Sequence, residues 1–99
     1  MSNANSKNLV NHPSHKNQIA HLNRITGQLE GIKRMIEDER YCIDILVQLK
    51  AVIASTKGIE NNILNTHLNH CVNNVIQSKN KEESELKVAE ILKLLKTFN

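Results

Sequence analysis

The 99-residue chain is poor in aromatic side chains, and it offers little bulk with which to close a hydrophobic core. Tyr41 and Phe98 make up its 2% of aromatic residues, and tryptophan is missing. A small helical protein with so few large side chains can bury only a limited core within one copy. We therefore expect the chain to cover its apolar faces by associating with further copies of itself.

The sequence also lacks the features of membrane and secreted proteins. No apolar run approaches the roughly 20 residues of a membrane-spanning helix, and no signal-peptide core is present. Two cysteines are too few for a disulfide framework, which favours reduced thiols and a cytoplasmic location. Neither sign of charge dominates, because thirteen basic residues face ten acidic ones, giving a net charge of +3. This balance permits an anionic partner without requiring one.

Two segments of different composition define the expected organisation. Residues 1–17 are polar, contain the only proline, and are predicted to form a flexible arm. In this arm His12 and His15 are better explained as solvated side chains than as metal ligands. Residues 18–99 are predicted to form one helical domain. Apolar residues in steps of three and four indicate its first helix and form one apolar stripe along it. This helix is expected to end at residues 37–40, three of which are acidic. The stripe consists of Leu22, Ile25, Leu29, Ile32 and Ile36.

The second helix is expected to be unusually long. Residues 41–78 contain no proline and only one glycine, and the helix should start near Tyr41 or Cys42. Residues 77–85 are predicted to form a polar connector, in which Asn80 and Glu83 have the spacing of a capping box. A third helix follows, with an apolar face made of Leu86, Val88, Ile91, Leu92, Leu95 and Phe98. The predicted class is therefore all-α, with three helices and one long central helix.

Both cysteines and one histidine recur at helical spacing along this central helix. His67 and Cys71 are four residues apart and can bind one metal ion together. Cys42 precedes Cys71 by 29 residues, which is about 43 Å along an α-helix. Either Cys42 is unrelated to the pair, or it meets the pair of another copy. An antiparallel dimer that crosses near Thr56 and Lys57 would create two equivalent sites by symmetry.

Two thiolates and one imidazole form a soft donor set, which selects copper(I), zinc or iron–sulfur clusters. Three ligands without an obvious fourth suit three-coordinate copper(I) better than structural zinc. A purely structural role is equally open, because cysteines at such positions are often buried hydrophobic residues. Cys42 and Cys71 of different chains could also form a disulfide or polysulfide. Glu90 is a candidate to hold the second ring nitrogen of His67, and Tyr41 could join the same network. From the residues alone, a solvated helix acid explains Glu90 better, and a rim packing residue explains Tyr41 better.

Basic side chains are spread over the first two expected helices. An ordinary solvated face explains such a set, although in a tetramer the patch would recur four times and could follow a phosphate backbone. No zinc finger, basic zipper or helix-turn-helix is evident, so composition alone does not establish DNA binding. The residues are His21, Arg24, Lys33, Arg34, Lys50 and Lys57.

Three motifs in a fixed order resemble one known family. They are R-I-x-G-Q-L-x-G-I at residues 24–32, Tyr-Cys at 41–42 and H-x-x-x-C at 67–71. Over about residues 18–98, the chain resembles the CsoR/RcnR family of small all-helical metal-sensing repressors. The resemblance implies an antiparallel dimer that pairs into a flat tetramer and binds operator DNA without a conventional DNA-binding motif.

The positions of the ligands indicate the branch within this family. The copper(I) branch has a Cys, His, Cys set, which Cys42, His67 and Cys71 match one by one. The nickel/cobalt and formaldehyde branches lack the second cysteine, and the persulfide-sensing branch lacks the histidine. Tyr41 and Glu90 match the tyrosine and glutamate that support the ligands in the copper branch.

The same resemblance assigns roles to the basic residues. Arg24 and Lys57 fall where the family has basic residues linked to DNA contact, and His21 takes a position often held by arginine or lysine. With Lys33 and Arg34, these are the predicted DNA-binding residues. The expected protein is a cytoplasmic copper(I)-responsive repressor that releases operator DNA when copper(I) joins two subunits. Alternatives are a thiol-based redox or persulfide-sensing repressor that uses the two cysteines, and a copper buffer without a DNA role. No nucleophile–base arrangement indicates an enzyme.

Overall fold

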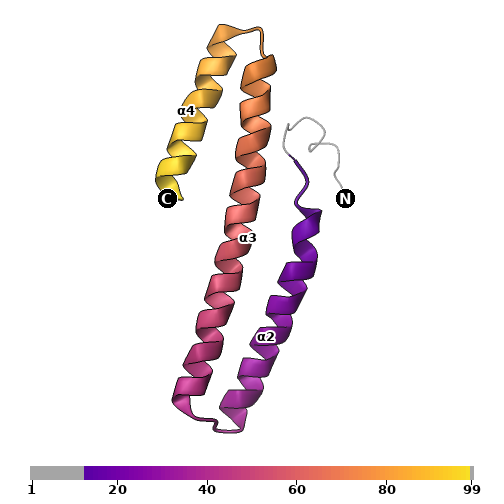
Figure 1. Cartoon of the computed structure of the whole chain (residues 1–99), viewed down its shortest axis with the longest axis vertical. Coiled ribbons are helices and arrows are strands. Elements are labelled where there is room, and N and C mark those ends of the chain that lie inside the picture. Colours follow the sequence, from indigo (N-terminus) through magenta and orange to yellow (C-terminus); the bar gives the residue numbers. More distant parts are fainter. Residues whose placement is uncertain (1–12, 99) are drawn as a thin grey trace. The chain divides into compact units, whose positions relative to one another are not determined.

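The computed structural model describes residues 13–98, and these residues form helices joined by short connections (Figure 1). The elements are a 3₁₀ turn η1 (Lys16–Gln18) and the α-helices α2 (Ile19–Glu37), α3 (Cys42–Gln77) and α4 (Lys81–Thr97). The predicted all-α class with three helices and a 36-residue central helix is confirmed. Residues 1–12 of the predicted arm lie outside the described residues, and the division into an arm and a domain stays a prediction.

Helix α3 is shared by two compact units, residues 14–63 and residues 64–98. In the first unit, α2 runs antiparallel to the first part of α3 (Figure 1). Ile25 and Ile32 of α2 and Ile59 of α3 are buried there. The Asn62 side-chain amide donates a hydrogen bond of 3.2 Å to Oε1 of the buried Gln18, which ties η1 to α3.

The turn between α2 and α3 places Cys42 at the first residue of α3. At the end of α2, the N–H of Arg40 donates to the Met35 carbonyl at 2.9 Å, and the N–H of Glu39 donates to the Ile36 carbonyl at 3.1 Å. This pair of bonds is a Schellman motif, in which a glycine usually takes the left-handed position. Here Glu39 takes it, with φ of 54°, at a cost of about 1 kcal/mol for a residue with a side chain.

In the second unit, the end of α3 and α4 are antiparallel and are joined by residues 78–80 (Figure 1). Oδ1 of Asn80 accepts a hydrogen bond of 3.1 Å from the backbone N–H of Glu83, as expected for an N-cap. The predicted connector over 77–85 is wrong, because α4 already begins at Lys81. The cap, together with Glu82 and Glu83 in the first turn, stabilises a helix start made of polar residues.

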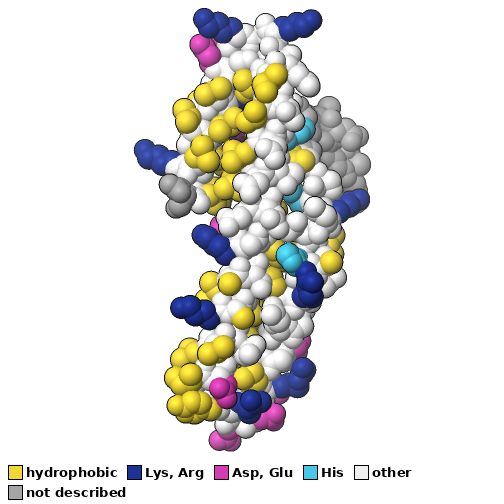
Figure 2. Space-filling view, in the orientation of Figure 1, with side chains coloured by type: hydrophobic (Ala, Val, Ile, Leu, Met, Phe, Trp, Pro, Cys, Tyr) yellow, Lys and Arg dark blue, Asp and Glu magenta, His cyan; other side chains and the backbone are white. Residues whose placement is uncertain are grey.

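Most large apolar side chains of the described residues are exposed. The buried hydrophobic residues are Ile25, Ile32, Ile59 and Cys71, whereas Leu22, Leu29 and Ile36 of the predicted α2 stripe are 45–58% exposed. Figure 2 shows hydrophobic side chains gathered on the surface of each unit. A single copy thus leaves much of its apolar surface uncovered, as its composition predicts. None of the helices in residues 13–98 combines the length and hydropathy that crossing a bilayer requires.

Candidate metal site

Helices α3 and α4 bring three potential ligands together in the unit of residues 64–98. His67 and Cys71 lie one turn apart on α3, and Nε2 of the imidazole is 3.3 Å from the Cys71 sulfur. Helix α4 supplies Glu90, whose Oε1 is 3.8 Å from the same sulfur. One ligand atom from each of the three residues lies within 4.8 Å of the others. The residues that the structure describes therefore contain one cluster able to hold a metal ion without rearrangement of the helices.

The Cys71 thiol is the buried centre of this cluster, with only 2% of its surface exposed. Burial raises the pKa of the Cys71 thiol, the negative charge of Glu90 raises this pKa further, and nearby Lys87 lowers it. The thiol therefore keeps its proton, which it donates to the Glu90 carboxylate. A metal ion that binds Cys71 must displace this proton, because thiolate is the ligating form.

Glu90 was predicted to support the site by holding the second ring nitrogen of His67, and this role stays a prediction. The residue is exposed, and its carboxylate contacts the Cys71 thiol. Spacing within α3 alone could not reveal this contact, because it depends on how α4 packs against α3.

Cys42 does not belong to this cluster. It is the first residue of α3, is exposed and has a free thiol. Tyr41, just before it, is 68% exposed. Because Cys42 precedes Cys71 by 29 residues of one continuous helix, about 43 Å at 1.5 Å per residue, both thiols of one chain cannot bind the same ion. The binding of one ion by Cys42 of one copy and Cys71 of another stays a prediction. His15 is partly buried, and His12 lies outside the described residues.

The predicted DNA-binding residues all lie in the unit of residues 14–63, and all are exposed: His21, Arg24, Lys33, Arg34 and Lys57. Two of them are ion-paired, Lys33 with Glu30 at 3.7 Å and Lys57 with Glu60 at 3.2 Å. Arg24 and Lys33 are nine residues apart on α2, so they project about 180° apart at 100° per residue. The five residues thus do not form one face of one copy, and their DNA contacts stay a prediction.

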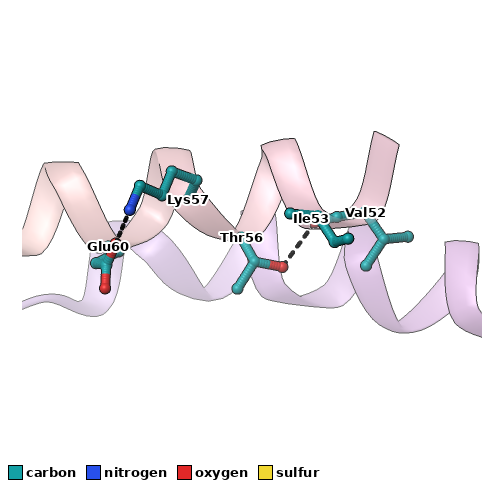
Figure 3. A pocket seen from close by; sticks show the side chains of 5 residues that line it. All are labelled: Val52, Ile53, Thr56, Lys57 and Glu60. Carbon is teal, nitrogen blue, oxygen red and sulfur yellow. Dashed lines mark hydrogen bonds and ion pairs between the residues drawn. The ribbon is translucent and has the colours of Figure 1, made fainter. Parts of the chain in front are cut away.

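A groove on α3 was not anticipated from the sequence. Its lining residues are Val52, Ile53, Thr56, Lys57 and Glu60, and its volume is about 420 Å³ (Figure 3). The Thr56 hydroxyl donates to the Val52 carbonyl at 2.7 Å, and the Lys57–Glu60 ion pair borders the groove. Ile53 is 68% exposed. The groove coincides with the residues at which two copies were predicted to cross.

Three comparisons connect this arrangement to known proteins. Residues 14–97 match the family model of metal-sensitive transcriptional repressors. The chain is 41% identical to the copper-sensing transcriptional repressor CsoR of Bacillus subtilis (strain 168), over 95% of this chain and 93% of that protein. The solved copper-sensing repressor CsoR with Cu(I) from Geobacillus thermodenitrificans NG80-2 superposes with a TM-score of 0.68 at 38% identity, covering 84% of this chain and 83% of that chain.

A second solved structure, of the nickel-responsive transcriptional regulator InrS, superposes with a TM-score of 0.75 at 27% identity, covering 89% of this chain and 96% of that chain. The similarity extends over all three helices, so it is not limited to the motifs that suggested it. It also confirms that the chain is of a regulatory and not an enzymatic type. The chain therefore belongs to the family of metal-sensitive transcriptional repressors.

Proposed function

We propose that this protein is a cytoplasmic copper(I)-responsive repressor, which binds operator DNA without metal and releases it when copper(I) joins two subunits. One observation carries the proposal. His67 and Cys71 lie together beside Glu90, whereas the other thiol, Cys42, is exposed at the far end of the same helix. A second subunit is then required to bring both thiols to one ion.

The donor atoms support copper(I) as the inducer. Similar solved proteins include a copper sensor and a nickel sensor, so the fold alone does not select the metal. Thiolate and imidazole are soft or borderline donors, and they favour copper(I), whereas a carboxylate oxygen does not. Glu90 is therefore a poor third ligand for copper(I). Cys42 of the partner subunit supplies the missing soft donor in the proposed site.

The spacing along α3 supports an antiparallel dimer. Cys42 lies 14 residues before Thr56, and Cys71 lies 14 residues after Lys57. In two antiparallel copies that cross between Thr56 and Lys57, each cysteine is level with the other cysteine of the opposite chain. The groove at the crossing and the exposed Ile53 offer a surface for this contact. We propose that two such dimers form a flat tetramer and bury further apolar surface.

Hydrogen bonds among the site residues suggest how metal binding reaches α4. In the structure, the Cys71 thiol donates to Glu90. When Cys71 binds as thiolate, Glu90 loses this donor, and it can then accept from the ring nitrogen of His67 that does not hold the metal. Tyr41 of the partner subunit, next to the incoming thiolate, is proposed to join this network. Because Glu90 lies on α4, we propose that its change of hydrogen-bond partner from Cys71 to His67 moves α4.

The basic residues are the proposed contacts for the phosphate backbone. The structure leaves all of them exposed: His21, Arg24, Lys33, Arg34 and Lys57. Since they face different directions in one copy, we propose that the tetramer aligns equivalent residues of several copies along the duplex. Copper(I) must bind the DNA-free form more tightly, so DNA must weaken copper binding by the same factor.

A gel mobility shift with DNA from the protein's own promoter tests whether the protein binds operator DNA and releases it with copper(I). Metal-free protein should retard this DNA at moderate salt, and stoichiometric copper(I) under anaerobic conditions should release it. Absence of a shift with metal-free protein would remove the repressor role and leave copper buffering. A shift that copper(I) does not reverse would remove copper(I) as the inducer.

X-ray absorption of the copper-loaded protein tests the ligands. The proposal expects one copper per protomer, coordinated by two sulfur atoms and one imidazole nitrogen. His67→Ala separates this function from the redox or persulfide alternative, in which the thiols act alone. A variant that still responds fully to its inducer without the imidazole would favour the sulfur-based alternative.

A further inference from the structure

We propose that Asn74 is a positioning residue of the sensing site, and that its side-chain amide donates a hydrogen bond to the Cys71 sulfur once this sulfur binds copper(I) as a thiolate. None of the sequence motifs includes Asn74. The inference rests on the proposed copper(I) site, and it adds to that site a residue that holds one of the ligands and does not touch the ion.

The side chain of Asn74 has an environment that is unfavourable for an amide. Within residues 13–98, the structure gives the buried Nδ2 of Asn74 no hydrogen-bond partner. A buried N–H group without an acceptor destabilises the folded protein, because folding removes the group from water and offers no replacement for the lost hydrogen bond. Native proteins seldom keep such a group without a functional reason. We infer that the acceptor for this amide forms only when the site binds its ion.

The geometry of α3 directs the Asn74 amide to Cys71. Asn74 follows Cys71 by three residues of one continuous helix, so the two side chains project about 60° apart and are separated by about 4.5 Å along the axis. Side chains of an α-helix lean toward its N-terminus and cover the preceding turn. The turn that precedes Asn74 contains Cys71. The sulfur of Cys71 is therefore the nearest side-chain atom of α3 that can become a strong acceptor.

The Cys71 sulfur is a poor acceptor as long as it carries its proton. In the structure it donates this proton to Oε1 of Glu90, and a thiol accepts hydrogen bonds only weakly. A thiolate carries a negative charge, and hydrogen bonds to charged acceptors are about twice as strong as those between neutral groups. Loss of the thiol proton on copper(I) binding thus turns Cys71 into the acceptor that the buried amide lacks.

A hydrogen bond from Asn74 would favour the copper-bound state for two reasons. Only 2% of the Cys71 surface is exposed, so water contributes little to solvation of the thiolate, and the amide supplies a donor in its place. The same bond removes the penalty of the unpaired N–H group. Residues that hydrogen-bond to metal ligands in this way typically change metal affinity by about 10- to 100-fold.

Copper(I) titrations of the full-length chain, in competition with a chelator of known affinity, test this role. Asn74→Leu, which has a similar size and no donor, should weaken copper(I) about tenfold. Asn74→Asp keeps the shape but places a negative charge beside the thiolate, so it should weaken copper(I) at least as much. Asn73→Leu changes an exposed neighbour on α3 and should stay within about twofold of the wild type. Wild-type affinity in either Asn74 variant would overturn the inference.

The stability of the metal-free protein distinguishes this role from a structural one. If Asn74 only supported the fold, its replacement would lower the midpoint of urea denaturation. We expect Asn74→Leu to raise this midpoint, because leucine buries no unpaired donor. The increase should exceed that of Asn73→Leu, which makes the same change in helix propensity at an exposed position. A midpoint below the wild type, or an increase no larger than that of the control, would overturn the inference.

Glu90 is the rival acceptor for the amide, because its carboxylate lies beside the same sulfur. A double-mutant cycle separates the two acceptors. If the amide donates to Cys71, Asn74→Leu should weaken copper(I) by the same factor in the Glu90→Ala background as in the wild type. If the effect of Asn74→Leu disappears in Glu90→Ala, the amide acts on Glu90 and the inference is wrong.

The same titrations separate this inference from the proposed function. Wild-type protein that binds copper(I) through two sulfur atoms, together with an Asn74→Leu variant of equal affinity, would overturn the role of Asn74 and leave the proposed function intact. Wild-type protein that does not bind copper(I) through Cys71 would overturn both, because Asn74 would then have no thiolate to hold.

Discussion

The two ends of α3 present the same side chain in opposite settings. Cys42, at the first residue, is exposed, and no described ligand partner accompanies it. Cys71, near the other end, is buried and contacts both His67 and Glu90. The difference teaches that one half of the proposed copper site is assembled within the chain, while the other half lies exposed at the surface. In the proposed function, a second copy completes the site, and metal sensing then coincides with a contact between subunits.

Removal of either thiol should have the largest effect. Cys71→Ala removes the half that is assembled within the chain, so copper(I) binding should fall by more than about a hundredfold. Cys42→Ser removes the exposed half and should weaken copper(I) to a similar degree. Competition titrations with a chelator of known affinity measure both effects. Wild-type copper(I) affinity in either variant would contradict a site that needs both ends of the helix.

Alkylation rates should report the same contrast without any metal. Cys71 should react with iodoacetamide at least about tenfold more slowly than Cys42, because Cys71 is buried and its raised pKa disfavours the reactive thiolate. Mass spectrometry of peptides at timed intervals measures both rates in one sample. Equal rates at neutral pH would contradict the described environment of Cys71.

The alkylation of Cys71 should depend on pH in a direction that follows from its raised pKa. Since the folded protein raises the pKa of Cys71, the midpoint of its alkylation should lie above the ordinary value for a thiol. The same shift stabilises the folded protein below the pKa of the unfolded thiol, and this contribution is lost as the pH rises through the higher folded value. Glu90→Gln removes the negative charge that helps to raise the pKa of Cys71, so it should lower the pH midpoint of Cys71 alkylation. Glu85→Gln, which removes a charge elsewhere on α4, should leave this midpoint unchanged.

Several of these features follow from the sequence, and their limits have physical reasons. Steps of three and four residues predict the helices, and the spacing of His67 and Cys71 predicts their pairing. The capping box at Asn80 and Glu83 marks the start of the third helix correctly, whereas the polar connector was predicted to extend too far, because residues 81–85 are polar and nevertheless form the first turn of α4. The contact of Glu90 with Cys71 could not be predicted, since it depends on packing between helices and not on spacing within one.

The two units also differ in how the helix ends near each cysteine affect the free energy of unfolding. Asn80 caps α4 in the unit that contains Cys71, and its side chain satisfies a backbone N–H. Asn80→Ala should therefore lower the free energy of unfolding by about 1 kcal/mol. Urea denaturation followed by circular dichroism measures the change. Asn80→Ser, which retains a capping oxygen, serves as the control and should lose much less.

The corresponding change at the Cys42 end should have the opposite sign and the smallest effect. Glu39 adopts a left-handed backbone conformation just before α3. Glu39→Gly should raise the free energy of unfolding by about 0.5–1 kcal/mol, because relief of strain exceeds the added entropy of the unfolded chain. Glu39→Ala keeps the strained conformation and should show no such gain in the same denaturation experiment. A gain in the alanine variant equal to that of glycine would point to lost charge repulsion instead.

The bridging of two subunits by copper(I) is tested most directly by mixing two inactive variants. Cys42→Ala retains His67 and Cys71, and Cys71→Ala retains Cys42, so neither variant alone can form a copper site with two thiolates. After the two proteins are unfolded together and refolded, each mixed dimer should regain one copper(I) site with wild-type affinity and two sulfur ligands. If the mixture binds copper(I) no better than the separate variants, the site does not lie between subunits and the account is contradicted.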